Sequence, residues 1–259
     1  MRLFLKCSIG LLLVIFSCRQ PTGNIYTNGT CIVVARSQSG ICVAADSRRV
    51  VSMAQRGSQF SVLRYDTVCK IHQVGHLFYA SAGTNTDPLD SIAESCISDT
   101  GNIVNLARDF ISKAILYRAI TLEKTRVNSP AEYEHYYKDL KNVGICFFGF
   151  ENNFPKIIDV SLIINSKPYE KVLIKDSTNY YLEPPITNTF VLLGHTDSIY
   201  NVLRADRFWK GQSFEDGMRK LVSIECDIDS IDVARPITVL AILSEKKFYW
   251  SKGSPCIFK

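Results

Sequence analysis

Two neighbouring stretches decide the fold, Gly29-Thr30-Cys31-Ile32-Val33-Val34-Ala35-Arg36 and Gly40-Ile41-Cys42-Val43-Ala44-Ala45-Asp46-Ser47-Arg48. Each contains a short apolar run with many β-branched residues, and a polar turn with a glycine separates them. This pattern predicts a β-hairpin with strands at residues 31–36 and 41–45. The strands are apolar on both faces, which is typical of a sheet covered on each side.

The same reading predicts the elements of the rest of the chain. Apolar runs predict strands at residues 68–74, 77–82, 144–150, 156–164, 169–174, 190–193, 236–243 and 247–250. Helical spacing of apolar residues predicts helices at residues 87–97, 103–124, 197–208 and 214–226, the last with Ser213 as its N-cap. Residues 51–66 are polar and are expected to be irregular, and the charged, Tyr-rich residues 125–141 are expected at the surface.

The order of these elements is strands, two helices, strands, two helices, strands. Because hairpins rather than strand–helix–strand units supply the strands, the sheets should be mostly antiparallel. We therefore predict an α+β protein, a four-layer αββα sandwich of two mostly antiparallel sheets flanked by helices. Residues 30–259 show no repeat and no linker and are expected to form one domain.

Composition and charge exclude several classes of protein. The 259 residues are 46% hydrophobic and 21% charged, which excludes a disordered chain, a collagen-like repeat and a coiled-coil rod. The formal net charge is +5, but Arg2, Lys6 and Arg19 lie in the first 29 residues, which contain no acid. The remaining residues are almost neutral and have no basic stripe, so a nucleic-acid partner is not expected.

Residues 1–29 have the layout of an export signal followed by a propeptide. Two basic residues precede the short apolar run Ile9–Phe16, which is too short to span a bilayer comfortably; a buried N-terminal strand or helix is the alternative. Ile15-Phe16-Ser17-Cys18 resembles the cleavage box of bacterial lipoproteins, so Cys18 is a candidate lipidation site, with simple signal cleavage as the alternative. The polar residues 20–28 suit a tether or a propeptide.

The spacing of the cysteines indicates neither a disulfide framework nor a metal site. Cys7 and Cys18 aside, seven remain, and no spacing among them or the histidines suggests a metal site. Four of the seven lie in apolar strand-like runs: Cys31, Cys42, Cys69 and Cys146. Buried free thiols explain this placement better than disulfides do.

The stretch from Gly29-Thr30 to Ala45-Asp46-Ser47-Arg48 resembles the opening of proteasome β-type subunits, which are N-terminal-nucleophile (Ntn) hydrolases. Later segments resemble that family in the same order over about residues 29–250. These segments are Cys69-Lys70-Ile71, Tyr79 to Asp87, Phe147 to Phe150, Gly194-His195-Thr196-Asp197-Ser198 and Pro236 to Ile242.

The resemblance implies a threonine nucleophile that self-cleavage exposes. A threonine hydroxyl is a poor nucleophile until a base removes its proton. If the Gly29–Thr30 bond is cut, the free α-amine of Thr30 becomes that base, and its reference pKa near 8 leaves it partly neutral near pH 7. By the resemblance, Lys70 polarises the hydroxyl, Asp46 is the partner of Lys70, and the Gly83 N–H is the oxyanion donor.

Each of these residues also has a simpler interpretation. Thr30 could be a strand-edge residue and Asp46 a turn residue that caps the hairpin. Lys70 could face solvent, and Gly83 could serve only the turn into the next helix. Cys31 could itself be the nucleophile of a cysteine-type relative.

The sequence departs from the family pattern near the expected site. The loop between Asp46 and Lys70 is longer than expected. His195 stands where the family has a supporting serine, and the family's late Asp-x-x-Ser-Gly is replaced by the acidic residues 227–232. His195 and Arg48 are therefore candidate accessory residues, and the catalytic competence of the site is open.

These observations lead to two hypotheses from different classes. The first is an exported threonine-type amidohydrolase or peptidase, periplasmic or attached to the bacterial membrane through a lipidated Cys18, acting on peptides or small amides without a cofactor or metal. The second is a non-catalytic, proteasome-like structural or assembly subunit. Assembly into homo-oligomers is expected in both cases, because the family forms rings.

Overall fold

A computed structural model describes residues 25–54, 60–83, 86–96, 101–130, 133, 143–167, 169–203, 205, 208–251 and 256. The predicted export segment and Cys18 lie outside the described residues. Within these ranges, no helix combines the length and the apolar character needed to cross a membrane.

Two five-stranded antiparallel sheets form the body of the molecule. The first has the order β11-β2-β3-β12-β13, with β2 at Cys31–Ser37, β3 at Gly40–Ala45, β11 at Thr189–Gly194, β12 at Thr238–Ser244 and β13 at Lys247–Trp250. The second has the order β10-β9-β8-β7-β6, with β6 at Ile71–Val74, β7 at Leu77–Ala82, β8 at Val143–Glu151, β9 at Phe154–Ile164 and β10 at Ile174–Tyr181. The predicted hairpin is confirmed, with Val34 opposite Val43 across β2 and β3.

A third, smaller sheet was not predicted. It has the order β1-β4-β5, with β1 at Ile25–Asn28, β4 at Arg48–Ala54 and β5 at Phe60–Thr67. The expectation of irregular structure is wrong for residues 51–54 and 60–66, which lie in strands, whereas residues 55–59 lie outside the described residues. The count of two sheets is also wrong, because the described residues form three. The reason is physical: β4 and β5 pair with each other and β4 also pairs with β1, so backbone pairing stabilises a hairpin that has few buried side chains.

Among the described residues, four helices cover the outer faces of the two large sheets: α1 at Asp87–Ser95, α2 at Ile103–Asn128, α4 at Asp197–Leu203 and α5 at Phe214–Ile228. The predicted cap of α5 is confirmed, because the Ser213 side chain accepts a hydrogen bond from the Asp216 N–H. α2 continues four residues beyond its predicted end at residue 124, whereas α4 stops at Leu203, well before the predicted residue 208.

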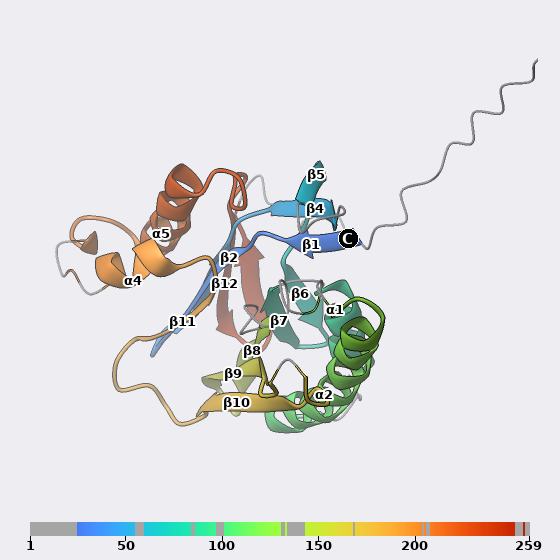
Figure 1. Cartoon of the computed structure of the whole chain (residues 1–259). Coiled ribbons are helices and arrows are strands. Elements are labelled where there is room, and N and C mark those ends of the chain that lie inside the picture. Colours follow the sequence, from blue (N-terminus) through green and yellow to red (C-terminus); the bar gives the residue numbers. More distant parts are fainter. Residues whose placement is uncertain are drawn as a thin grey trace, which may run out of the picture.

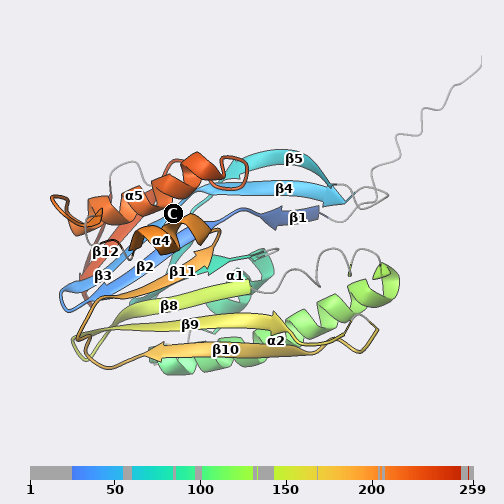
Figure 2. The ribbon, with the colours of Figure 1, turned by 60° about the vertical axis from the view of Figure 1, so that its left-hand side comes forward.

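Figures 1 and 2 show the sheets and the helices packed as layers. Three apolar clusters of described side chains hold these layers together. The central cluster lies between the two large sheets and joins side chains such as Ile32 and Val34 to Phe78 and Phe148. A second cluster lies between β7–β9 and helices α1 and α2. A third lies between the first sheet and helices α4 and α5, and it takes up Cys31, which alternates with Ile32 along β2. The α+β class and the antiparallel sheets are confirmed.

Three further predictions need correction. The strand expected at residues 169–174 lies later, as β10, where it pairs with β9 from Ile174↔Ile164 to Tyr181↔Ile157. Within the expected surface stretch 125–141, Tyr133 is buried. Cys69 is not a free thiol, because it forms a disulfide with Cys256 across a sequence separation of 187 residues. The other cysteines that the structure describes are free and buried: Cys31, Cys42, Cys96, Cys146 and Cys226.

Candidate active site

The Gly29–Thr30 peptide bond lies at the junction of β1 and β2. The hydroxyl of Thr30 donates a hydrogen bond to the Gly29 carbonyl oxygen at 2.6 Å, and the Lys70 ammonium donates to the same oxygen at 2.6 Å. Thr30 is 8% exposed. The carbonyl of the predicted cleavage site is therefore buried and accepts two hydrogen bonds.

Asp46 ends the hairpin β2–β3 and gathers four donors. Its Oδ1 accepts from the Lys70 ammonium at 2.7 Å and from the Cys31 N–H at 2.8 Å. Its Oδ2 accepts from the backbone N–H groups of Arg48 and Ala234 at 3.0 and 3.3 Å. Asp46 therefore does more than cap a turn, because it ties the first residue of β2 to the lysine and to the segment before β12.

Lys70 lies directly before β6, and its side chain is 6% exposed, so the solvent-facing alternative is wrong. Burial lowers the pKa of the Lys70 ammonium, and the negative charge and hydrogen bond of Asp46 oppose that effect. A buried ammonium with one carboxylate and one carbonyl partner can stabilise negative charge that develops on that carbonyl oxygen. We call Gly29, Thr30, Asp46 and Lys70 the Thr30 cluster.

Two glycines allow the chain to approach this cluster closely. Gly29 has φ +85°, and a Cβ there would lie 2.4 Å from the Asp232 carbonyl oxygen. Gly194 has φ +80°, and a Cβ there would lie 2.0 Å from the Thr30 carbonyl oxygen. Both positions therefore require glycine on conformational and on steric grounds.

Gly83 follows β7 directly and has φ +131°. Its neighbour Ala82 lies beside Gly194, since a Cβ on Gly194 would lie 3.4 Å from the Ala82 side chain. Gly83 is therefore the next residue along the chain from Ala82, which lies beside Gly194, and Gly194 packs against the Thr30 carbonyl oxygen. The contacts described do not include one between Gly83 and Thr30, so its role as oxyanion donor stays a prediction.

Both predicted accessory residues lie near the cluster. The His195 N–H donates to the Thr30 carbonyl oxygen at 2.7 Å. Its imidazole Nδ1 lies 2.9 Å from Asp229 Oδ2, and its Nε2 lies 3.9 Å from Asp232 Oδ2. The Arg48 guanidinium, by contrast, donates to the carbonyl oxygens of Ser230 and Ile231 and lies over the Tyr65 ring at 4.8 Å.

Cys31 points away from the polar residues of the Thr30 cluster. Its side chain is fully buried in the apolar cluster below α5, together with Met218 and Val222. Burial, reinforced by the charge of Asp46, raises the pKa of the Cys31 thiol. Because the thiolate is the nucleophilic form, this environment opposes a role of Cys31 as nucleophile.

Reasoning from the sequence did not find two features beside the site. Asp229 and Asp232 were seen only as a departure from the family pattern, although their spacing of three residues is a usable signal for two carboxylates in one turn. The disulfide of Cys69 adjoins Lys70, and spacing alone gives no signal for it, because its two cysteines are far apart in the chain.

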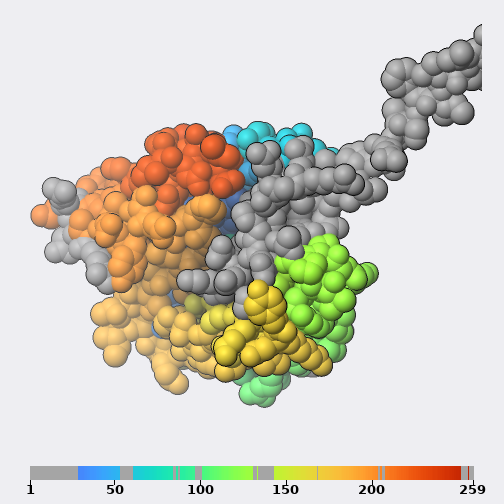
Figure 3. Space-filling model, in the orientation of Figure 1, coloured from blue at the N-terminus to red at the C-terminus, as the bar shows by residue number. Residues whose placement is uncertain are grey.

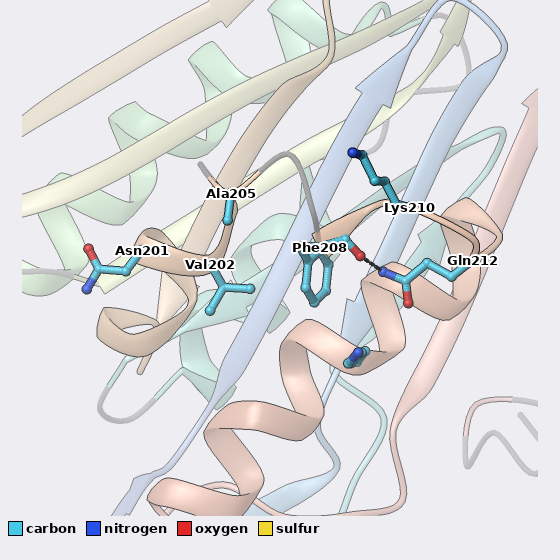
Figure 4. A pocket seen from close by; sticks show the side chains of 7 residues that line it. Asn201, Val202, Ala205, Phe208, Lys210 and Gln212 are labelled. Atoms are coloured by element: carbon cyan, nitrogen blue, oxygen red, sulfur yellow. Dashed lines mark hydrogen bonds between the residues drawn. The ribbon is translucent and has the colours of Figure 1, made fainter.

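A pocket of about 530 Å³ opens elsewhere, between α4 and the start of α5 (Figure 4). Its lining combines apolar groups, carboxamides and two ammonium groups: Asn201, Val202, Ala205, Phe208, Lys210, Gln212 and Lys220. Lys220 lies over the Phe208 ring at 5.5 Å, and Gln212 donates to the Phe208 carbonyl oxygen. None of these residues belongs to the Thr30 cluster, so the pocket is a separate feature.

Comparison of the sequence with protein-family models finds no match, and comparison with curated proteins finds no significant similarity.

Proposed function

We propose that the chain has the four-layer αββα fold of the Ntn hydrolases and acts as a self-activating threonine hydrolase on amide bonds. The observation that carries this proposal is the pair of hydrogen bonds on the Gly29 carbonyl oxygen. A nucleophile precursor (the Thr30 hydroxyl) and a buried cation (Lys70) meet on one peptide carbonyl, and a carboxylate holds the cation in place.

Self-activation would proceed through an ester. Thr30 Oγ1 attacks the carbonyl carbon of Gly29, and the Lys70 ammonium stabilises the negative charge that develops on the carbonyl oxygen. The C–N bond then breaks as the Thr30 nitrogen takes up the proton lost by the hydroxyl, which leaves the Gly29 acyl group on Oγ1. Water hydrolyses this ester and releases a carboxylate on Gly29 and a free amine and hydroxyl on Thr30.

The mature site would repeat the same chemistry on a substrate amide. The Thr30 α-amine takes the proton from Oγ1, and Oγ1 forms an acyl-enzyme ester with the substrate. The Gly83 N–H is the predicted donor to the oxyanion. The positive charge of Lys70 would lower the pKa of the Thr30 α-amine, so that the amine is neutral and can act as a base. These steps use no cofactor or metal.

The β1 strand supports a peptide-type substrate. β1 immediately precedes the bond to be cut and pairs antiparallel with β4, from Ile25↔Met53 to Asn28↔Val50. After cleavage this strand becomes a separate N-terminal piece, and its departure frees the edge of β4. An extended substrate could pair with the same edge by backbone hydrogen bonds.

A non-catalytic structural or assembly subunit remains the second candidate. It is favoured by His195 in place of the family's supporting serine and by the low exposure of Thr30. Homo-oligomer formation fits both functions. Export, to the periplasm or to a membrane through a lipidated Cys18, is part of the proposal, and a disulfide beside Lys70 is chemically consistent with an oxidising compartment.

Intact-mass analysis and N-terminal sequencing of the purified protein test this function. We expect a mature chain that begins at Thr30, slower processing in Thr30→Ser and no processing in Thr30→Ala. Incubating the mature chain with short fluorogenic peptide amides then tests hydrolysis. A wild-type chain that keeps residues 19–29 and behaves like Thr30→Ala in both assays would establish the structural alternative instead.

A further inference from the structure

Three side chains with metal-binding atoms converge next to Thr30. His195 follows β11, and Asp229 and Asp232 lie in the turn that follows α5. One ligand atom from each residue can be chosen so that all three lie within 4.8 Å of one another. Two hydrogen bonds fix the turn, because the Asp232 backbone N–H donates to the side-chain Oδ1 of Asp229 and the Val233 backbone N–H donates to the Asp229 carbonyl oxygen. We call these three residues the His195 cluster.

The two acidic side chains of the His195 cluster are largely enclosed. Two carboxylates are both about three-quarters buried, with side-chain exposures of 28% for Asp229 and 26% for Asp232. The nearby Arg48 donates to the backbone carbonyls of Ser230 and Ile231. The ionic contacts described for these two carboxylates are those with His195.

The donor set indicates which ions would fit. Imidazole and carboxylate ligands bind Zn²⁺ at about 2.0–2.2 Å, and such mixed sets also suit Mn²⁺ and Co²⁺, whereas Ca²⁺ and Mg²⁺ prefer oxygen ligands throughout. We propose that His195, Asp229 and Asp232 bind one divalent transition-metal ion directly beside the Gly29–Thr30 bond. The direct contact between His195 and Asp229 is then replaced by coordination of both side chains to the same ion. The remaining coordination positions of the ion are left for water.

Backbone contacts connect this metal site to the Thr30 cluster. The His195 N–H holds the Thr30 carbonyl oxygen, and the Asp232 carbonyl packs against Gly29. An ion that fixes His195 and Asp232 therefore fixes both residues of the bond that self-activation would cut. Metal binding does not depend on the proposed hydrolase function, because the three ligands are in place before any cleavage.

The untagged full chain, stripped with a chelator, is titrated calorimetrically with Zn²⁺ and with Mn²⁺, and bound metal is counted after dialysis. We expect one ion per chain and a rise in melting temperature on binding. His195→Gln and Asp232→Asn should each weaken binding at least tenfold and abolish that rise. A Co²⁺-loaded sample should show visible absorption bands that change in His195→Gln.

Asp227→Asn is the matched control, because Asp227 lies close by in sequence but is 63% exposed and pairs with Arg235. It should bind the ion like the wild type. The proposal is overturned if the wild type binds no ion stoichiometrically, or if folded His195→Gln and Asp232→Asn retain wild-type affinity. Both outcomes are independent of whether Thr30 is processed.

Discussion

The Lys70 ammonium lies 2.7 Å from Asp46 Oδ1 and 2.6 Å from the Gly29 carbonyl oxygen, and both side chains are almost completely buried. A buried pair of this kind adds little stability compared with an apolar pair, but removal of one partner leaves the other charge without compensation. The pair therefore makes the position of Lys70 relative to Gly29 depend on Asp46.

Replacement of the lysine tests this coupling. We expect Lys70→Met to lower the free energy of unfolding by about 3–5 kcal/mol, because Asp46 becomes an unpaired buried carboxylate. The double variant Lys70→Met/Asp46→Asn should recover part of the loss, measured by urea denaturation. Neither variant should be cleaved at Gly29–Thr30, even though the double variant regains stability. This result would separate the chemical role of Lys70 from its structural role. Equal stability of the two variants would show that the pair is not coupled.

Gly29 should be the most sensitive glycine for processing. An alanine there would need a left-handed backbone and would place its Cβ 2.4 Å from the Asp232 carbonyl oxygen. We expect Gly29→Ala to slow processing at least tenfold, measured as the fraction of mature chain in a time course by mass spectrometry. Gly211→Ala is the control, since Gly211 has φ +76° but open space around it. It should lose only about 1 kcal/mol of stability and process normally.

The disulfide between Cys69 and Cys256 should anchor the segment that carries Lys70. We expect Cys69→Ala/Cys256→Ala to lose about 2–5 kcal/mol of stability, because the long loop is no longer closed in the unfolded chain. A reducing agent should lower the stability of the wild type by a similar amount and leave the double variant unchanged. Cys96→Ala, at a free buried thiol, should keep its response to the reducing agent. A wild type that is insensitive to reduction would contradict this role.

Most strands of the two large sheets, and the presence of the helices that cover them, could be predicted because their apolar runs have clear periods. Residues 31–35 and 41–45 alternate between the cluster shared by the two sheets and the cluster below α5, and this is visible as runs that are apolar on both faces. The β4–β5 hairpin gives no such signal. In β5, Val62, Leu63 and Tyr65 are exposed, so the pairing of β5 with β4 defines that strand rather than burial. Cyan atoms of this hairpin lie at the surface beside red atoms of α5 in Figure 3.

The candidate site was predictable only in part. The roles of Thr30, Asp46 and Lys70 came from a resemblance, and the structure brings these residues within hydrogen-bond distance of one another or of Gly29. The grouping of His195 with Asp229 and Asp232 depends on how the turn after β11 meets the turn after α5. These segments are more than 30 positions apart in the chain, and a single sequence does not show how close they lie in the folded protein.

The buried thiols predict how stability depends on pH. Burial raises the pKa of Cys146 well above its usual value, and the pKa of Cys42 rises to about 12 for the same reason. In the unfolded chain these thiols ionise near pH 9, whereas in the native chain they keep their protons. The native state then binds more protons, so stability falls as pH rises above about 9, by about 1.4 kcal/mol per pH unit for each thiol.

Urea denaturation at pH 8 and pH 10 measures this loss. Cys146→Ala should be less stable than the wild type at pH 8 because it leaves a small cavity, but it should lose about 1.4 kcal/mol less between the two pH values. Ser112→Ala, at an exposed helix position, is a control that should show the full wild-type loss. If Cys146→Ala showed the same pH dependence as the wild type, the thiol would be ionising in the folded protein, and Cys146 could not be enclosed between the two sheets as the structure has it.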